Sequence, residues 1–232
     1  MTNPPFGDLL RARARQAELA LESPEIDQLQ RYLALLTTWN RAINLTALPL
    51  EPPTEQTVDR LFIEPLAAAQ FLRGLRERIP NPESRIPVWF DLGSGGGSPA
   101  IPMKIALPSL DLTMVESRSR KSTFLQEVIR TLDLDRTRVE RVRFEVLSAD
   151  SSSVDCITCR ALRTSPILQD FARRLLRPGG WLLLFSSSRT LEPFEGFTTI
   201  ETVELPGSHD SFLHVLARMF HVEQTASIDL TK

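Results

Sequence analysis

The 232 residues of this chain are 42% hydrophobic and 24% charged, with a formal net charge of −2 at pH 7, which is typical of a globular protein and excludes a disordered or fibrous one. No apolar run is long enough to cross a bilayer, so we expect no membrane partner. The N-terminus lacks the basic and apolar regions of a signal peptide, and we therefore expect a cytoplasmic protein.

The N-terminal part of the chain is predicted to be helical. Ser23 is suited to cap the second helix and Pro24 to open it, and apolar residues then recur at helical spacing. Glu64-Pro65 is early enough in the third helix to be tolerated or to kink it. We interpret residues 1–86 as a helical cap with a linker. The helices are expected over residues 8–22, 24–40 and 58–72, with a polar break at 40–46 and a proline-rich loop at 49–53.

The glycine-rich stretch after residue 88 organises the rest of the chain. Residues 88–92 are an apolar run that includes Asp91 and predicts a buried strand, and the glycines of residues 93–97 predict a tight turn into a helix over 99–107. The next predicted strand, 112–116, ends on Glu116. A doubly wound fold places the carboxylate that accepts ribose hydroxyls at this distance from the glycines.

The same turn favours one class of nucleoside cofactor. A dinucleotide needs free backbone N–H groups at the helix N-terminus for its pyrophosphate, but Pro99 and Pro102 have none to donate there. A cofactor with a ribose and an amino-acid end but no phosphate fits better, which indicates S-adenosylmethionine. Dinucleotide binding, or a doubly wound fold without a cofactor, remain the alternatives.

Alternating strands and helices in the remaining chain predict a mostly parallel sheet covered on both faces. Pro178-Gly179-Gly180 is predicted to be a turn. Cys156 and Cys159 form a C-x-x-C, but they lie in a predicted strand, where residues three apart point to opposite faces, so we expect core packing and no metal site. The further strands are expected near 139–145, 154–159, 181–185, 198–205 and 212–218, and the helices at 119–132 and 165–176; the tail from residue 221 is polar.

The charges are unevenly distributed along the chain. Between residues 160 and 189 there are six arginines and a single acid, Asp170, whereas acids predominate after residue 190. A basic face on a nearly neutral protein suits a phosphate-rich substrate. The alternative interpretation is that about half of these arginines simply lie on solvent-exposed faces of helices and bind no substrate.

Three pieces of the chain together resemble the bacterial GidB-type methyltransferases, which make 7-methylguanosine in 16S ribosomal RNA. They are the W-N-x-x-x-N-L-T sequence of residues 39–46, the glycine turn with its prolines, and Cys159-Arg160-Ala161. The resemblance extends from about Tyr32 to Arg218. It implies a Rossmann-like class I S-adenosylmethionine-dependent methyltransferase domain over residues 87–220, with 16S rRNA or the small ribosomal subunit as the partner.

The resemblance also implies roles for individual residues. Glu116 would accept the ribose hydroxyls and Phe144 would pack against adenine, although core packing is an equal alternative for Phe144. Arg160, at the end of a strand, is the first choice for a catalytic and cofactor-binding residue. The cofactor-binding set is Asp91, Gly93, Ser94, Gly95, Gly97, Ser98, Glu116, Phe144, Glu145 and Arg160, and the candidate RNA contacts are Arg118, Arg120, Lys121, Arg163 and Asn44, the last of which is as well explained as a helix cap.

The chain departs from the family pattern on the substrate side. The family often has a histidine in the helix before the sheet, but residues 60–64 read Arg-Leu-Phe-Ile-Glu, and the lysine usual after the fifth strand is replaced by serines at 186–188. Guanine N7 carries a lone pair and needs no general base, so the reaction does not require the missing histidine. A non-catalytic RNA-binding or assembly protein, or a methyltransferase of small molecules, remain alternatives.

Overall fold

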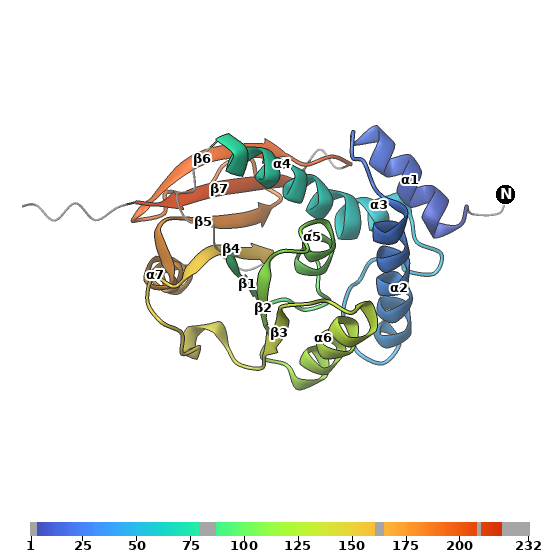
Figure 1. Cartoon of the computed structure of the whole chain (residues 1–232), viewed down its shortest axis with the longest axis horizontal. Coiled ribbons are helices and arrows are strands. Elements are labelled where there is room, and N and C mark those ends of the chain that lie inside the picture. Colours follow the sequence, from blue (N-terminus) through green and yellow to red (C-terminus); the bar gives the residue numbers. More distant parts are fainter. Residues whose placement is uncertain (1–3, 79–86, 161–164, 208–209, 220–232) are drawn as a thin grey trace, which may run out of the picture.

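The computed structural model describes residues 4–78, 87–160, 165–207 and 210–219. Its centre is a seven-stranded sheet in the order β3-β2-β1-β4-β5-β7-β6 (Figure 1). Neighbouring strands are parallel from β3 to β5, and β7 is antiparallel to both β5 and β6. The strands are β1 (Val88–Leu92), β2 (Asp111–Val115), β3 (Thr137–Glu140), β4 (Val154–Arg160), β5 (Leu176–Ser186), β6 (Phe197–Glu204) and β7 (Phe212–Arg218).

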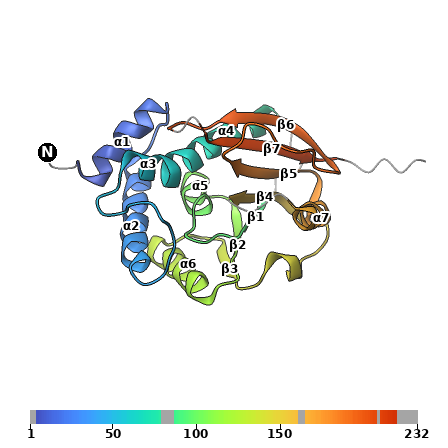
Figure 2. The ribbon, with the colours of Figure 1, turned by 180° about the vertical axis from the view of Figure 1, so that it is seen from behind.

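The helices cover the two faces of this sheet very unequally. Figures 1 and 2 show α2, α4, α5 and α6 on one side of the sheet and α7 on the other. Side chains alternate along β1, so that Trp89 joins the apolar core on the many-helix side and Phe90 joins the core beneath α7. The α-helices are α1 (Phe6–Gln16), α2 (Ser23–Asn40), α3 (Glu55–Val58), α4 (Glu64–Arg78), α5 (Ala100–Ala106), α6 (Ser119–Leu132) and α7 (Pro166–Leu175).

The N-terminal helices share one core with the sheet. A single cluster of buried side chains includes Leu10 of α1, Leu29 of α2 and Leu72 of α4 together with Met114 of β2 and Leu183 of β5. Burial of apolar area at about 25 cal/mol per Å² therefore holds the helices directly on the sheet. The helices and the sheet are therefore packed as one unit.

The start of α2 differs from the prediction. Ser23 lies inside the first turn, and Glu22 is the N-cap residue. The Glu22 side chain accepts the N–H of Glu25 and the Glu25 side chain accepts the N–H of Glu22 at 2.8 Å, which is a reciprocal capping box. The predicted Ser23 cap is wrong because this carboxylate pair satisfies the free N–H groups one residue earlier. The first helix also ends earlier than predicted, at Gln16.

The third predicted helix is divided into three segments. It begins with α3, continues as a π-helix, η1 (Asp59–Ile63), and resumes as α4 at Glu64-Pro65. A π-turn widens the helix by one residue and is frequent at functional sites. The helix expected over 58–72 is therefore present, but residues 59–63 of it, before the proline, are a π-helix.

Two further predictions in the sheet are wrong. β3 ends at Glu140, and residues 144–146 form a 3₁₀ turn, η2 (Phe144–Val146), so the strand expected over 139–145 is shorter and lies earlier. Pro178-Gly179-Gly180 lies within β5. Val154 pairs with Leu176, but Cys156 pairs with Trp181, so this segment bulges out of the ladder, and Gly179 takes a φ of 76° there.

The two cysteines confirm the expected core packing. Cys156 is buried in the core on the many-helix side and Cys159 in the core on the α7 side, which is the alternation of a strand. The described residues contain no cluster of side chains that could hold a metal. No helix within them is both long and apolar enough to cross a membrane.

Candidate functional site

The site forms where the parallel strands β1, β2 and β4 end side by side. β1 lies between β2 and β4 in the sheet, so the strand order reverses at β1, and ligands of doubly wound sheets bind at such a reversal. Asp91 is the last residue but one of β1, Glu116 directly follows β2, and Arg160 ends β4. The topology therefore brings three of the predicted charged residues to one edge.

The glycine turn has few N–H groups left for a phosphate. Gly93 and Ser94 donate theirs to the Val115 carbonyl at 2.9 and 3.2 Å, and Gly97 donates to the Ser94 carbonyl at 2.7 Å. Gly95 donates to the Glu116 carboxylate at 3.0 Å. These internal bonds support the exclusion of a dinucleotide, whose pyrophosphate requires such donors.

Glycine is required at Gly97 in particular. Its φ is +90°, and a Cβ there would lie 2.8 Å from Cγ1 of Ile101 and 3.1 Å from the Tyr32 hydroxyl. A side chain at this position would be both strained and in collision with its neighbours. The turn is thus held against both the following helix and α2.

Asp91 is a buried carboxylate with one oxygen unused. Its Oδ1 accepts the Thr158 hydroxyl at 2.6 Å, whereas Oδ2 is buried and has no hydrogen-bond partner among the described residues. Burial raises the pKa of Asp91 to about 6, and the hydrogen bond from Thr158 and the charge of Arg160 oppose this rise. An unpaired buried acceptor is costly to maintain, so Oδ2 is well suited to accept a hydrogen bond from a cationic ligand group.

Glu116 is more deeply embedded than a cleft-facing acid. Its side chain is buried, and its two oxygens accept the N–H groups of Gly95 at 3.0 Å and Arg118 at 2.8 Å. The carboxylate therefore joins the glycine turn to the start of α6. Each carboxylate oxygen has a second lone pair, so these bonds leave acceptor capacity for a ribose.

Arg160 is held by the cap helices. Its Nη2 donates to Oε2 of Glu64 at 2.8 Å and its Nη1 to the Arg60 carbonyl at 2.5 Å, and its guanidinium lies 4.5 Å from the centre of the Phe185 ring. The Arg160 side chain is 11% exposed, and its Nε is buried without a partner in the described chain. Burial lowers the pKa of Arg160 to about 10, and Glu64 opposes this fall, so the guanidinium stays charged at neutral pH.

Three residues that form hydrogen bonds with the site at the strand ends were not predicted from the sequence. The Tyr32 hydroxyl donates to the Gly96 carbonyl at 2.5 Å. Glu64 holds Arg160, and Ser211 accepts a hydrogen bond from Arg60 at 3.0 Å. Of the three, only Glu64 could have been suspected from the sequence, because an acid within the apolar stripe of a helix needs a partner when it is buried. Nothing in the sequence around Tyr32 or Ser211 indicates their contacts.

Phe144 and Glu145 lie in η2, beyond the end of β3. The Phe144 ring packs on Phe171 of α7 with the centroids 5.3 Å apart, so Phe144 contributes to the core beneath α7 and is only partly buried. Glu145 pairs with Arg143 at 3.1 Å. The neighbouring Val146 is 71% exposed, which leaves an apolar side chain at this rim.

Four of the five candidate RNA-contacting residues lie in the part of the chain that the structure describes. Arg118 and Arg120 are exposed and Lys121 is half-buried at the first turn of α6, which contains no acid. Cations at a helix N-terminus oppose the helix dipole, so helix stability does not explain them. Asn44 is exposed in the loop after α2, and the side chain that orders this loop is Asn40, which accepts the N–H groups of Leu45 and Thr46. Arg163 lies outside the described residues.

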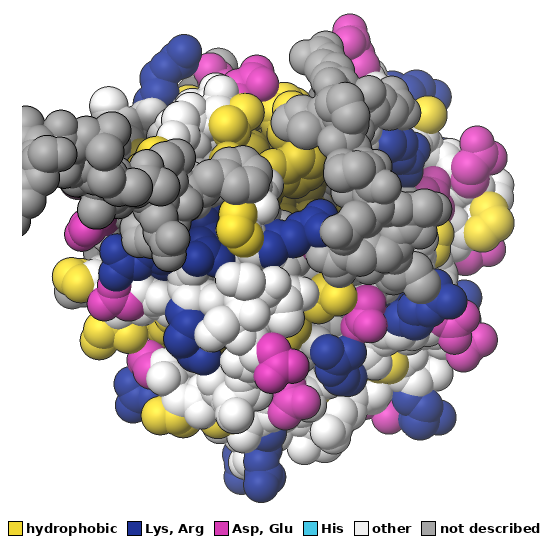
Figure 3. All heavy atoms as spheres, turned by 60° about the vertical axis from the view of Figure 1, so that its left-hand side comes forward, with side chains coloured by type: hydrophobic (Ala, Val, Ile, Leu, Met, Phe, Trp, Pro, Cys, Tyr) yellow, Lys and Arg dark blue, Asp and Glu magenta, His cyan; other side chains and the backbone are white. Residues whose placement is uncertain are grey.

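The basic segment after residue 160 is largely engaged within the fold. Arg173 pairs with Asp170 at 2.6 Å, Arg177 pairs with Asp155 at 2.5 Å, and Arg174 donates to the Leu147 carbonyl at 3.4 Å. Figure 3, which turns the left-hand side of Figure 1 forward, shows Lys and Arg side chains intermixed with carboxylates. The idea of one basic face for a phosphate-rich substrate is therefore not supported for these three arginines.

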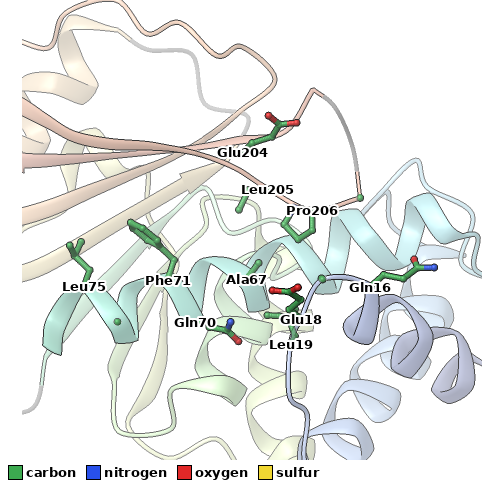
Figure 4. A pocket seen from close by; sticks show the side chains of 13 residues that line it. Gln16, Glu18, Leu19, Ala67, Gln70, Phe71, Leu75, Glu204, Leu205 and Pro206 are labelled. Carbon is green, nitrogen blue, oxygen red and sulfur yellow. The ribbon is translucent and has the colours of Figure 1, made fainter. Parts of the chain in front are cut away.

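A groove of about 830 Å³ lies away from the glycine turn. Figure 4 shows its apolar walls, with Phe71 and Leu75 of α4 facing Leu205 and Pro206 after β6, and Leu19 after α1. None of the predicted cofactor residues lines it. Its size therefore does not identify it as the cofactor site, for which the polar chemistry at the strand ends is the better guide.

The family comparison places most of the chain within one family model. The model named GidB, described as rRNA small subunit methyltransferase G, matches residues 25–216. The described part of this range contains the glycine turn, Glu116 and Arg160 together with their partners Tyr32 and Glu64.

Individual proteins agree with this match. The chain is 38% identical over 173 residues to the Ribosomal RNA small subunit methyltransferase G of Xanthomonas axonopodis pv. citri, covering 74% of this chain and 71% of that protein. The protein of the same name from Desulfitobacterium hafniense is 31% identical over 193 residues, covering 82% and 74%. The crystal structure of a putative methylase from Haemophilus influenzae superposes with a TM-score of 0.52 at 12% identity, covering 66% of this chain and 89% of that one, which shows a shared fold.

Proposed function

The chain belongs to the GidB family of rRNA small subunit methyltransferase G proteins, and from this premise we propose that it transfers the methyl group of S-adenosylmethionine to N7 of a guanine in 16S ribosomal RNA. The observation that carries the proposal is the set of unused buried polar atoms at the strand ends, Asp91 Oδ2 and Arg160 Nε. The substrate is the naked RNA or the small ribosomal subunit.

The residues at the strand ends fit this cofactor. An unpaired carboxylate oxygen on Asp91 suits the cofactor's ammonium, and the spare lone pairs of Glu116 suit the two ribose hydroxyls. Gly93, Ser94, Gly95, Gly97 and Ser98 would form the floor, with Phe144 and Glu145 beside the adenine. When bound, S-adenosylmethionine supplies a methyl group on a positively charged sulfur, which makes that methyl group electrophilic.

The chain's own contribution is alignment and charge. Guanine N7 is an exposed acceptor with a lone pair, so no side chain has to remove a proton. Arg160 would orient the reacting groups, and a well-aligned geometry supplies on the order of 7–11 kcal/mol in favourable cases. Arg118, Arg120 and Lys121 would hold RNA phosphates beside the site, and Arg163 and Asn44 are weaker candidates for the same role.

Measuring the methylation of 16S rRNA tests the proposed function. Mass spectrometry of 16S rRNA fragments from cells with and without the protein should show one methylated guanine that depends on it. The purified protein should consume the cofactor with deproteinised rRNA or with small subunits. Consumption with a metabolite pool alone would indicate a methyltransferase of small molecules, and cofactor binding without turnover would indicate an assembly protein.

We expect Glu116→Ala to affect both cofactor binding and the fold. The variant should bind S-adenosylhomocysteine more weakly by about 1.5–3 kcal/mol, the range for hydrogen bonds to a charged group. It should also unfold more easily by about 1–3 kcal/mol, because two backbone N–H groups lose their acceptor. Calorimetry and denaturant titration measure the two effects. Unchanged affinity in a folded variant would place the ribose contact elsewhere.

We expect alanine at Arg118, Arg120 or Lys121 to weaken RNA binding in a salt-dependent way. Each lost phosphate contact should reduce the slope of log K against log salt by about 0.7–0.9. RNA affinity measured across a salt series gives this slope. Arg130→Ala is the matched control, since Arg130 lies at the other end of α6 and pairs with Glu127. Equal slopes in all variants would remove α6 from the RNA-binding surface.

A further inference from the structure

The break between η1 and α4 leaves two backbone carbonyls without their helical partner. Residue 65 is a proline and has no N–H. In a regular α-helix the N–H of residue 65 would donate to the carbonyl of Leu61, and in a continued π-helix it would donate to that of Arg60. The N–H of Glu64 donates to the Asp59 carbonyl rather than to that of Arg60, so the Arg60 and Leu61 carbonyls both lack an α-helical donor and can accept from groups outside the helix.

Each of these carbonyls is used by a residue of the candidate site. The Arg60 carbonyl accepts Nη1 of Arg160 at 2.5 Å. The Leu61 carbonyl accepts the Ser98 hydroxyl at 3.0 Å. Arg160 ends β4 and Ser98 ends the glycine turn, so one interruption of a cap helix contacts two separate elements of the site.

Glu64, directly before the proline, completes the arrangement. Its side chain is only 1% exposed and accepts Nη2 of Arg160 at 2.8 Å. Arg60 donates to the same carboxylate at 3.1 Å and to the Ser211 hydroxyl at 3.0 Å. Burial raises the pKa of Glu64, and the two arginines oppose the rise. Phe185 lies against one face of the guanidinium, so Arg160 has partners at Nη1, at Nη2 and on that face, whereas its Nε has none among the described residues.

We propose that Glu64 and Pro65 are positioning residues, which use this interruption of the cap helix to hold Arg160 and Ser98 so that the unpaired Nε of Arg160 faces the bound cofactor. The inference rests on the proposed function for the identity of the cofactor. A proline inside a helix is strongly unfavourable for helix stability. The two carbonyls that it frees supply a reason for its presence.

Pro65→Ala separates positioning from stability. The variant regains an N–H that competes for the Arg60 and Leu61 carbonyls, so the helix should be more stable while Arg160 is held less firmly. We expect the melting temperature to stay the same or rise and the affinity for S-adenosylhomocysteine to fall roughly tenfold, as when one charge-assisted hydrogen bond is lost. Pro24→Ala is the matched control, because Pro24 lies in the first turn of α2, where no carbonyl is freed.

Substitution of Glu64 provides an independent measurement. Glu64→Gln removes the charge that faces Arg160, and Glu64→Asp keeps it, so the affinity lost in the first variant should be largely restored in the second. Asp59→Asn is the matched control: Asp59 is a buried carboxylate of the same π-helix, and it pairs with Arg13 at 2.6 Å. The Asp59→Asn variant should unfold more easily than the wild type and bind S-adenosylhomocysteine with the same affinity.

The outcomes distinguish this inference from the proposed function. Wild-type affinity in both Pro65→Ala and Glu64→Gln would overturn the positioning role and leave the proposed function intact. A wild-type protein that binds S-adenosylhomocysteine but does not methylate rRNA would overturn the proposed function, and the affinities of the variants would still test the positioning role. A wild-type protein that does not bind the compound would overturn both.

Discussion

Arg160→Ala should lower methyl transfer at saturating cofactor by roughly 100-fold, in the range found when one preorganised charged donor is removed from an active site. Arg160 is a predicted site residue that ends a central strand and donates hydrogen bonds to the cap. Its loss removes the unpaired Nε together with the positive charge, which persists at neutral pH because the pKa of Arg160 is lowered only to about 10. Single-turnover kinetics on small subunits measures the effect.

Stability must be followed in the same variant. Breaking a buried ion pair by removing one partner can cost about 3–5 kcal/mol, but Glu64 keeps Arg60 as a partner, so we expect a smaller loss. Arg173→Ala is the control, since Arg173 is 41% exposed and pairs with Asp170 on the far face of the sheet. Equal and small effects of both substitutions on turnover would exclude Arg160 from the reaction.

Asp91→Asn should stabilise the fold while abolishing most cofactor binding. Burial raises the pKa of Asp91 from its ordinary value of 3.8 to about 6. Between these values the unfolded chain has lost its proton and the folded chain retains it, so stability falls as the pH rises through this window. Above about pH 6 the ionised carboxylate costs the wild type about 2–3 kcal/mol, which asparagine avoids.

Denaturant titrations at pH 4 and pH 7.5 check this prediction. The variant should be more stable than the wild type at pH 7.5 and similar to it at pH 4. Asp155→Asn should do the opposite at pH 7.5, because Asp155 pairs with Arg177 at 2.5 Å and accepts the N–H of Val88. Calorimetry with S-adenosylhomocysteine should show little binding to Asp91→Asn. Wild-type affinity would contradict the assignment of Oδ2 to a cationic ligand group.

Local sequence patterns were sufficient for most of the fold. The predicted bounds of β1 and α6 agree with the structure because an apolar strand next to glycines and an amphipathic helix are both local signals. The bulge at Gly179 was missed because Pro-Gly-Gly is also a turn signal, and only the pairing of β4 with β5 shows that the strand continues. The π-helix was missed because its side chains contact residues far away in the sequence, as Asp59 contacts Arg13, 46 positions away, and no local pattern relates them.

The candidate site was predictable only where its residues follow the ends of strands. Asp91, Glu116 and Arg160 could be placed at one edge because parallel strands end together. The pairing of Arg160 with Glu64 spans 96 positions, and no periodicity relates the two. The two backbone N–H groups that Glu116 accepts, from Gly95 and Arg118, could not be predicted, because no local pattern shows which way the residue after a strand turns.

The single core shared by the N-terminal helices and the sheet bears on how the chain folds during synthesis. Residues 4–78 leave the ribosome before any strand does, yet their buried side chains pack against strands that begin at Val88. Isolated helices of this length are marginal in water. The N-terminal helices contact one another, as Phe6 and Tyr32 do with Phe62, but the sheet surface that they cover is absent until β1, β2 and β4 have emerged. These helices are therefore made before the strands that bury them, and during that interval their sheet-facing apolar side chains are open to chaperones or to aggregation.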